Sequence, residues 1–189
     1  KPVICCGLLN FFFNYKQLST ITGLGRVFYP IWRTTKLKNT VIFLYKLSQI
    51  KTFKMFFQNS DDLKYFSELK INKQKNFVLV NGSGVDLDIF KYNNNGFKNN
   101  SILMISRLLN QKGVLLFLKA AEIIKPKYNN LNFILIGKKE EGKDALKFEE
   151  IKKYIDNKII TYIPRTYEIQ KYLTNSKIFV LPSIYREGM

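Results

Sequence analysis

Residues 101–128, SILMISRLLNQKGVLLFLKAAEIIKPKY, determine the fold class of this 189-residue chain. The apolar run Ser101–Ile105 is typical of a buried strand, and a polar turn leads from it into a segment of helical periodicity, Lys112–Tyr128. The apolar positions of that segment share one helix face: Val114, Leu115, Phe117, Leu118, Ala121 and Ile124. A strand followed by a helix with one apolar face is the repeating unit of a parallel α/β sheet.

The same alternation continues on both sides of this unit. Downstream, we predict strands at Leu131–Ile136, Ile159–Thr161 and Ile178–Leu181, separated by helices at Ala145–Tyr154 and Tyr167–Thr174. Upstream, we predict strands at Gln17–Thr22, Lys54–Phe57 and Phe77–Val80, a helix at Leu63–Leu69 and an apolar core helix at Val3–Phe13. This order predicts the α/β class and, from Ser101 onward, a doubly wound nucleotide-binding domain.

Composition restricts the chemistry. The net charge is +17, which attracts nucleic acid, anionic lipid or diphosphate-linked substrates. The cations are mostly Lys and the chain is rich in Asn and Ile, so the bias of an AT-rich coding sequence is an equal explanation. The absence of His excludes a Ser–His or Cys–His nucleophile pair. Cys5 and Cys6 are adjacent, and we expect two buried thiols in a reducing cytosol.

Loops after parallel strands are where ligands bind, and three of them are candidates. The loop Ser106–Gly113 places Arg107 and Lys112 at the opening of a helix, where both could face an anion, although this loop taken alone favours solvated loop cations. Glu187 follows the last strand and could bind sugar hydroxyls or pair with its neighbour on the surface. The segment Thr22–Gly25 is more typical of a tight turn than of a phosphate cradle.

Taken together, several short motifs resemble the retaining family-4 glycosyltransferases of the GT-B fold. In the second half they are Asn81–Asp86, Ile105–Arg107 with Lys112-Gly113, Ile134–Gly137, and Val180–Ser183 with Glu187–Met189. In the first half, Ile21–Phe28 and Phe57–Asp62 resemble the subgroup that extends polyprenyl-diphosphate-linked oligosaccharides with N-acetylhexosamines or related sugars.

The resemblance implies two Rossmann-like domains, both incomplete in this chain. Residues 1–84 would be the C-terminal part of an acceptor-side domain, and residues 85–189 the N-terminal part of a donor-binding domain. Arg107 and Lys112 would bind the donor diphosphate, and Glu187 would be catalytic. Other residues implied in donor sugar or nucleotide binding are Gly113, Arg165, Gly188 and Met189. On the acceptor side they are Thr22, Gly23 and Gly25.

The function implied by the resemblance is transfer of a sugar from a nucleotide-sugar donor, with UDP favoured, to a lipid-linked or polysaccharide acceptor with retention of configuration. No metal, other cofactor or nucleic-acid partner is expected, and the location would be cytoplasmic, with peripheral contact to the anionic inner face of the membrane as an option. The second Glu of the family's Glu-x7-Glu motif would fall beyond residue 189, so part of the nucleotide site would be missing. We expect this chain alone to be inactive and poorly stable, because neither sheet would be complete. The alternatives are a basic non-enzymatic α/β module that binds nucleic acid or anionic membrane, and an inactive truncated gene product.

Overall fold

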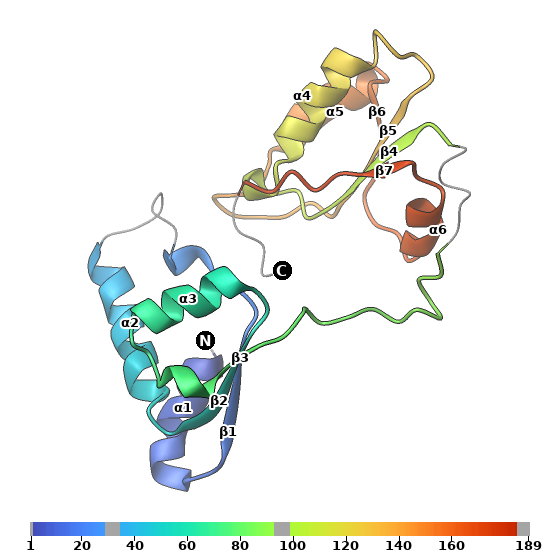
Figure 1. Ribbon diagram of the computed structural model, residues 1–189. Coiled ribbons are helices and arrows are strands. Elements are labelled where there is room, and N and C mark those ends of the chain that lie inside the picture. Colours follow the sequence, from blue (N-terminus) through green and yellow to red (C-terminus); the bar gives the residue numbers. More distant parts are fainter. Residues whose placement is uncertain (1, 29–34, 93–98, 185–189) are drawn as a thin grey trace. The chain divides into compact units, whose positions relative to one another are not determined.

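The computed structural model describes residues 2–28, 35–92 and 99–184, which form two compact units (Figure 1). Residues up to Gly84 build the first unit, and the second begins at Val85. Every sheet in the described residues is parallel, which confirms the α/β class. The acceptor-side and donor-side roles given to residues 1–84 and 85–189 stay predictions.

The first unit is a parallel sheet of strand order β1-β2-β3 with helices packed on it. Its core centres on Phe57 and Phe66, which are fully buried and pack edge to face with ring centroids 5.3 Å apart. The elements are α1 (Pro2–Phe13), β1 (Gln17–Ile21), η1 (Arg26–Phe28), α2 (Thr35–Ser48), β2 (Thr52–Phe57), α3 (Ser60–Glu68), η3 (Gln74–Asn76) and β3 (Phe77–Leu79).

The second unit is a parallel sheet of strand order β6-β5-β4-β7. Its strands therefore run third, second, first and fourth in chain order, as in doubly wound domains. Figure 1 shows α4 and α5 on one side of this sheet and α6 on the other. The elements are β4 (Ser101–Ile105), η5 (Asn110–Lys112), α4 (Val114–Ile124), β5 (Asn132–Ile136), α5 (Phe148–Asp156), β6 (Ile160–Ile163), α6 (Ile169–Thr174) and β7 (Ile178–Phe179).

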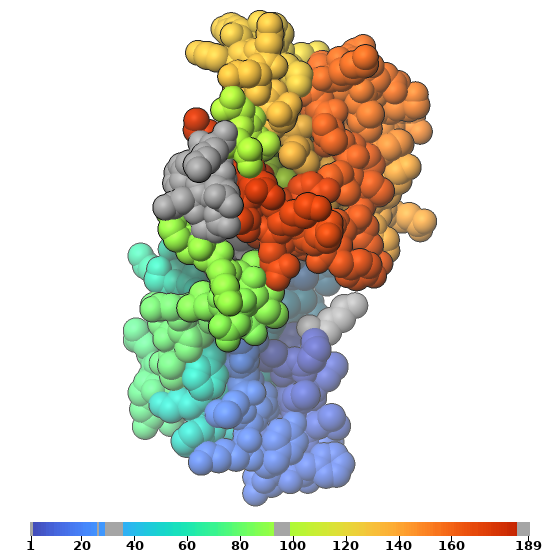
Figure 2. Space-filling view, turned by 90° about the vertical axis from the view of Figure 1, so that its right-hand side faces the viewer, coloured from blue at the N-terminus to red at the C-terminus, as the bar shows by residue number. Residues whose placement is uncertain are grey.

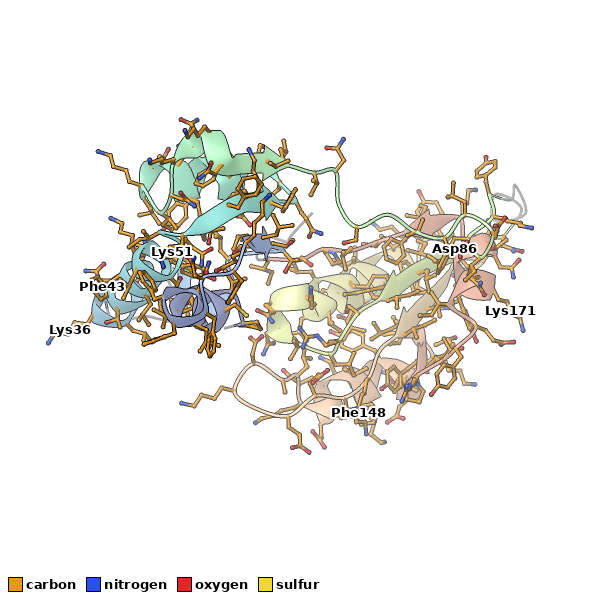
Figure 3. All side chains as sticks on the ribbon, turned by 90° about the horizontal axis from the view of Figure 1, so that it is seen from below. Lys36, Phe43, Lys51, Asp86, Phe148 and Lys171 are labelled. Carbon is orange, nitrogen blue, oxygen red and sulfur yellow. The ribbon has the colours of Figure 1, made fainter. Side chains whose placement is uncertain are left out.

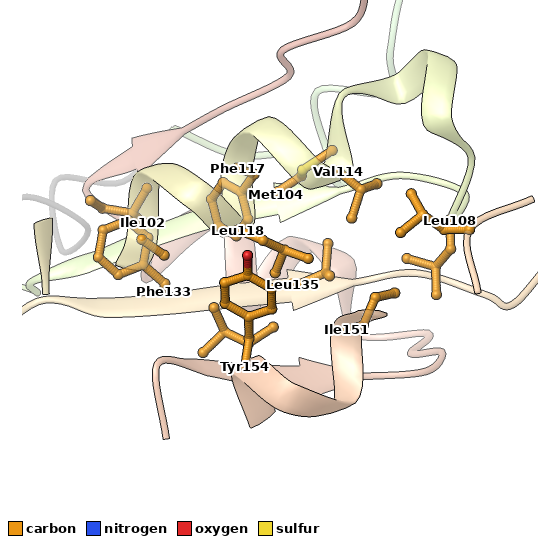
Figure 4. Packing of buried hydrophobic residues seen from close by; sticks show 13 residues of the cluster. Ile102, Met104, Leu108, Val114, Phe117, Leu118, Phe133, Leu135, Ile151 and Tyr154 are labelled. Atoms are coloured by element: carbon orange, nitrogen blue, oxygen red, sulfur yellow. The ribbon is translucent and has the colours of Figure 1, made fainter. Parts of the chain in front are cut away.

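The larger core lies between this sheet and the two helices α4 and α5 (Figure 4). Leu118 of α4, Leu135 of β5 and Ile151 of α5 are fully buried there. The rings of Phe117 and Phe133 meet edge to face with centroids 5.8 Å apart, which fixes α4 against β5. This packing holds α4 and α5 against the sheet.

The structure differs from the sequence prediction at both ends of α4. The predicted helix Lys112–Tyr128 is α-helical over Val114–Ile124. Gly113 has a left-handed backbone (φ 72°), which separates the helix from η5, and Pro126 cannot continue it at the other end.

The prediction of buried thiols is wrong, because Cys5 and Cys6 are exposed and free. The side of α1 that faces its own unit carries Gly7 and Asn10, and the two cysteines lie away from it. In the part of the chain that the structure describes, no helix is long and apolar enough to cross a membrane.

Candidate functional site

The strand order of the second sheet reverses between β4 and β7. The chain moves from β4 through β5 to β6 and then returns to the other side of β4 as β7. In open parallel sheets, ligands bind in the crevice outside the carboxyl ends of the strands at such a switch point. The loops that follow β4 and β7 therefore define the candidate site.

The loop after β4 is held by backbone hydrogen bonds to the loop after β5. The N–H of Leu108 donates to Lys138 O (3.2 Å), and the N–H of Asn110 donates to Asp144 O (2.9 Å). Leu108 O in turn accepts from the N–H of Leu146 (3.0 Å). The backbone that carries the predicted phosphate-binding residues is thus fixed at several points before any ligand binds.

Arg107 and Lys112 both lie on this fixed loop. Arg107 is exposed two residues after the end of β4, and Lys112 is half-buried at the end of η5. The structure therefore places two cations in one loop beside the switch point. Positive charges at this edge of a parallel sheet favour an anion such as a diphosphate.

Gly113 joins the loop after β4 to the loop after β7. A Cβ atom at this position would overlap the carbonyl oxygen of Pro182, so only a glycine allows the two backbones to approach so closely. Beside this contact, the N–H of Ile184 donates to Gln111 O (2.9 Å). The two loops of the switch point are therefore one packed assembly.

Three predicted site residues follow this assembly in the sequence. Glu187, Gly188 and Met189 lie outside the described residues, three to five positions after Ile184. Their catalytic and donor-binding roles stay predictions.

Arg165 lies in the loop after β6, at the same carboxyl edge of the sheet. Its guanidinium carbon is 4.8 Å from the ring centroid of Tyr167, and both side chains are exposed. In the sheet, β5 stands between β6 and β4. Arg165 is thus at the carboxyl edge of the sheet, in the loop after the outermost strand β6, and β5 separates that strand from β4, which precedes the loop of Arg107.

The predicted acceptor-side residues belong to the first unit. Thr22, Gly23 and Gly25 are exposed in the loop after β1. Gly25 has a left-handed backbone (φ 67°), and its carbonyl accepts from the N–H of Phe28 (3.3 Å). This segment is the turn into η1, and its acceptor-binding role stays a prediction.

Two further residues support the site: Gly137, which the sequence analysis named only as the end of a motif, and Tyr162, which it missed. Gly137 packs so closely that a Cβ atom there would overlap the Ser106 carbonyl oxygen. The hydroxyl of Tyr162 donates to Gly137 O (2.8 Å), and its ring packs on Phe148 with centroids 5.5 Å apart. Burial raises the pKa of the Tyr162 hydroxyl, so this donor keeps its proton to a higher pH than an ordinary tyrosine does. The strand-ending position of Gly137 was the available signal.

Replacing Tyr162 with Phe tests this support. We expect the free energy of unfolding to fall by about 1 kcal/mol, because Gly137 O loses its donor while the packing of the ring on Phe148 remains. The raised pKa stabilises the fold below the unfolded tyrosine pKa, and this stabilisation is lost as pH rises through the higher folded value. Urea unfolding at neutral and alkaline pH measures both effects, and an unchanged free energy at neutral pH would contradict the role.

A parallel sheet of this order, with two cations and a close glycine contact at the switch point, is typical of nucleotide-binding α/β proteins. The family described as "Glycosyl transferases group 1" matches residues 85–189, which is more than half of the chain. The chain belongs to this family.

Relatives extend the likeness to both units. The chain is 28% identical over 186 residues to the N,N'-diacetylbacillosaminyl-diphospho-undecaprenol alpha-1,3-N-acetylgalactosaminyltransferase of Campylobacter jejuni. That match covers 91% of this chain and 47% of the relative, so the chain spans about half the length of the curated relative it matches.

Solved structures show the same fold. Anabaena Alr3699/HepE, in complex with UDP and glucose, superposes with a TM-score of 0.70 at 12% identity and covers 98% of this chain and 51% of its own. Staphylococcus aureus TarM superposes with a TM-score of 0.66 at 19% identity, over 95% of this chain and 36% of its own. The GT-B fold class predicted from the sequence is thus confirmed.

Proposed function

We propose that the protein transfers a sugar from a UDP-linked donor to a polyprenyl-diphosphate-linked or polysaccharide acceptor, with retention of configuration. The observation that carries this proposal is the loop of Arg107 and Lys112 at the switch point of the second sheet, locked against the loop after β7 by Gly113. Family membership supplies the reaction class, and the named activity of the Campylobacter relative supplies the class of acceptor.

The proposed chemistry follows from charge. When the bond between sugar and diphosphate breaks, negative charge grows on the diphosphate. Arg107 and Lys112 stabilise this charge more in the transition state than in the ground state, which lowers the barrier. Glu187, Gly188 and Met189 contact the donor sugar in this proposal, and Arg165 contacts the nucleotide. Thr22, Gly23 and Gly25 face the acceptor.

The cations are proposed to take the role that a metal ion has in other nucleotide-sugar enzymes. In the part of the chain that the structure describes, no group of three or more Cys, Asp or Glu side chains is placed to hold a metal. We also propose a cytoplasmic location, where nucleotide-sugar donors are available, and no nucleic-acid partner.

Nucleotide binding tests the proposal without knowledge of the sugar. We expect UDP at 100 times its Kd to stabilise the protein encoded by the complete gene by about 2.7 kcal/mol, because binding favours the folded state. Thermal unfolding with UDP, ADP and no nucleotide measures this shift, and release of UDP from UDP-N-acetylhexosamine with a polyprenyl-diphosphate-linked acceptor measures transfer. Tight DNA binding without any response to nucleotide would instead support the non-enzymatic basic module, and no response to either would support an inactive product.

A further inference from the structure

The loop after β5 carries a cation that the proposed reaction does not use. Lys139 lies three residues after the end of β5, at the carboxyl edge of the second sheet. Its ammonium is 3.3 Å from the ring centroid of Phe148, the first residue of α5 (Figure 3 labels Phe148). An ammonium over the face of an aromatic ring is attracted by the electrons of the ring. The contact therefore gives this exposed side chain a preferred position.

The ring of Phe148 is itself held in place. It is partly buried against the core of the second unit, and it packs on the ring of Tyr162 with centroids 5.5 Å apart. The Tyr162 hydroxyl donates to Gly137 O, and Gly137 lies so close to the Ser106 carbonyl oxygen that a Cβ atom would overlap it. A series of contacts thus connects the ring under Lys139 to the start of the loop after β4.

Lys139 also lies next to the loop of the two predicted diphosphate-binding cations. The N–H of Leu108, the neighbour of Arg107, donates to the carbonyl oxygen of Lys138, the neighbour of Lys139 (3.2 Å). The strands β4 and β5 that precede these loops are paired, and paired strands lie about 4.8 Å apart. Arg107, Lys112 and Lys139 therefore belong to two adjacent loops at one edge of the sheet.

The contact with the ring holds Lys139 without neutralising its charge. A carboxylate partner would also restrain the ammonium, but it would cancel the positive charge that an anion could use. Within residues 2–28, 35–92 and 99–184, no carboxylate forms an ion pair with Lys139, and this includes Glu140 and Glu141, which follow it in the sequence. The charge of Lys139 therefore adds to the positive potential of this edge.

We propose that Lys139 is a third cation of the donor diphosphate site and that Phe148 positions it. The inference rests on the proposed function, which supplies the diphosphate. UDP carries more negative charge than a UDP-linked sugar, because its terminal phosphate is not esterified. Lys139 should therefore strengthen the binding of UDP more than that of the donor.

The affinity of UDP for the variant Lys139→Ala tests this role. Calorimetry compares the variant with the unmodified form of the protein encoded by the complete gene. We expect UDP to bind about tenfold more weakly to the variant, because one charge-assisted contact with a phosphate is lost. Uridine has no phosphate, so its affinity in an NMR titration should not change. The melting temperature should change little, because the Lys139 side chain is exposed.

The variant Phe148→Leu tests the positioning role of the ring. Leucine still packs against the core but offers no ring face to the ammonium, so we expect UDP to bind about threefold more weakly. In the double variant Lys139→Ala/Phe148→Leu, the affinity should equal that of Lys139→Ala, because the ring acts through the lysine.

Lys153 provides a matched control. Its ammonium lies 4.7 Å from the ring centroid of Tyr154, so this lysine also lies over a ring of the second unit. It belongs to α5, whose residues are orange in Figure 2, and not to either of the two loops. Lys153→Ala should bind UDP as tightly as the unmodified protein does.

Several results would overturn the inference. UDP affinity that is equal in Lys139→Ala and the unmodified protein would show that Lys139 does not contact the diphosphate. Equal losses of affinity for UDP and uridine would show that the lysine supports the fold of the site and not the phosphates. Additive losses in the double variant would show that Phe148 does not position Lys139. If the unmodified protein binds no UDP, the proposed function is wrong and this inference is wrong with it.

Discussion

We expect replacement of Arg107 or Lys112 with Ala to lower kcat/KM for sugar transfer by about 100- to 1000-fold, because in the proposed reaction the leaving diphosphate loses one stabilising positive charge. Both cations lie on a loop that is fixed to the loop after β5 by the hydrogen bonds of Leu108 and Asn110. The side chains are therefore removed without rearranging the backbone that carries them. Steady-state release of UDP by the protein encoded by the complete gene measures the effect.

Two further variants distinguish a specific role in diphosphate binding from a general effect of positive charge. Arg107→Lys keeps the charge but loses the planar fork of donors, so we expect an intermediate loss. Lys119→Ala removes one cation from the exposed side of α4 and should leave transfer unchanged. If Arg107→Ala and Lys112→Ala both turn over within a few-fold of the unmodified protein, the loop is not the diphosphate site.

The second large effect is expected at Gly113. In Gly113→Ala, the alanine has to adopt a left-handed backbone, and its methyl group overlaps the carbonyl oxygen of Pro182. The loop after β7 therefore has to move. The left-handed strain costs about 1–2 kcal/mol, and overpacking adds about 1–3 kcal/mol. We expect a clear drop in melting temperature together with loss of UDP binding, measured by thermal unfolding and calorimetry.

Gly84 provides a matched control for the backbone strain. Its φ is 71°, nearly that of Gly113, and a Cβ atom there would meet nothing within 4 Å. Gly84→Ala therefore carries the strain without the overlap and should retain UDP binding. Equal losses in the two variants would show that the contact between Gly113 and Pro182 does not matter.

The sequence predicted the second sheet well because its signals are strong and local. The sequence shows uninterrupted apolar runs at β4 and β5 and apolar residues at helical spacing in α4. Loops do not show either pattern. The loop of Arg107 and Lys112 followed from its position after β4. The sequence could not show that Gly113 touches Pro182, because that contact joins residues far apart in the chain.

The first unit was harder to predict. The helix α2 was missed: its start is rich in Lys and Thr, and Val41, Ile42 and Thr40 lower helix propensity through branching at Cβ. The burial of Cys5 and Cys6 was predicted from apolar composition, but a helix without charged residues does not reveal which side faces its own core.

The pairing of β7 with β4 also has a consequence for the order of folding. Ile102 of β4 pairs with Ile178 of β7, so most of the sequence of the second unit lies between these two residues. By contrast, one crossover connects β4 to its neighbour β5, and one connects β5 to its neighbour β6. Contacts between residues distant in sequence form late because they close long loops. During synthesis, β4, β5 and β6 can therefore assemble before β7 has been made, and Pro182 reaches Gly113 afterwards. If the proposed function is correct, nucleotide affinity should accordingly appear only after β7 has paired with β4.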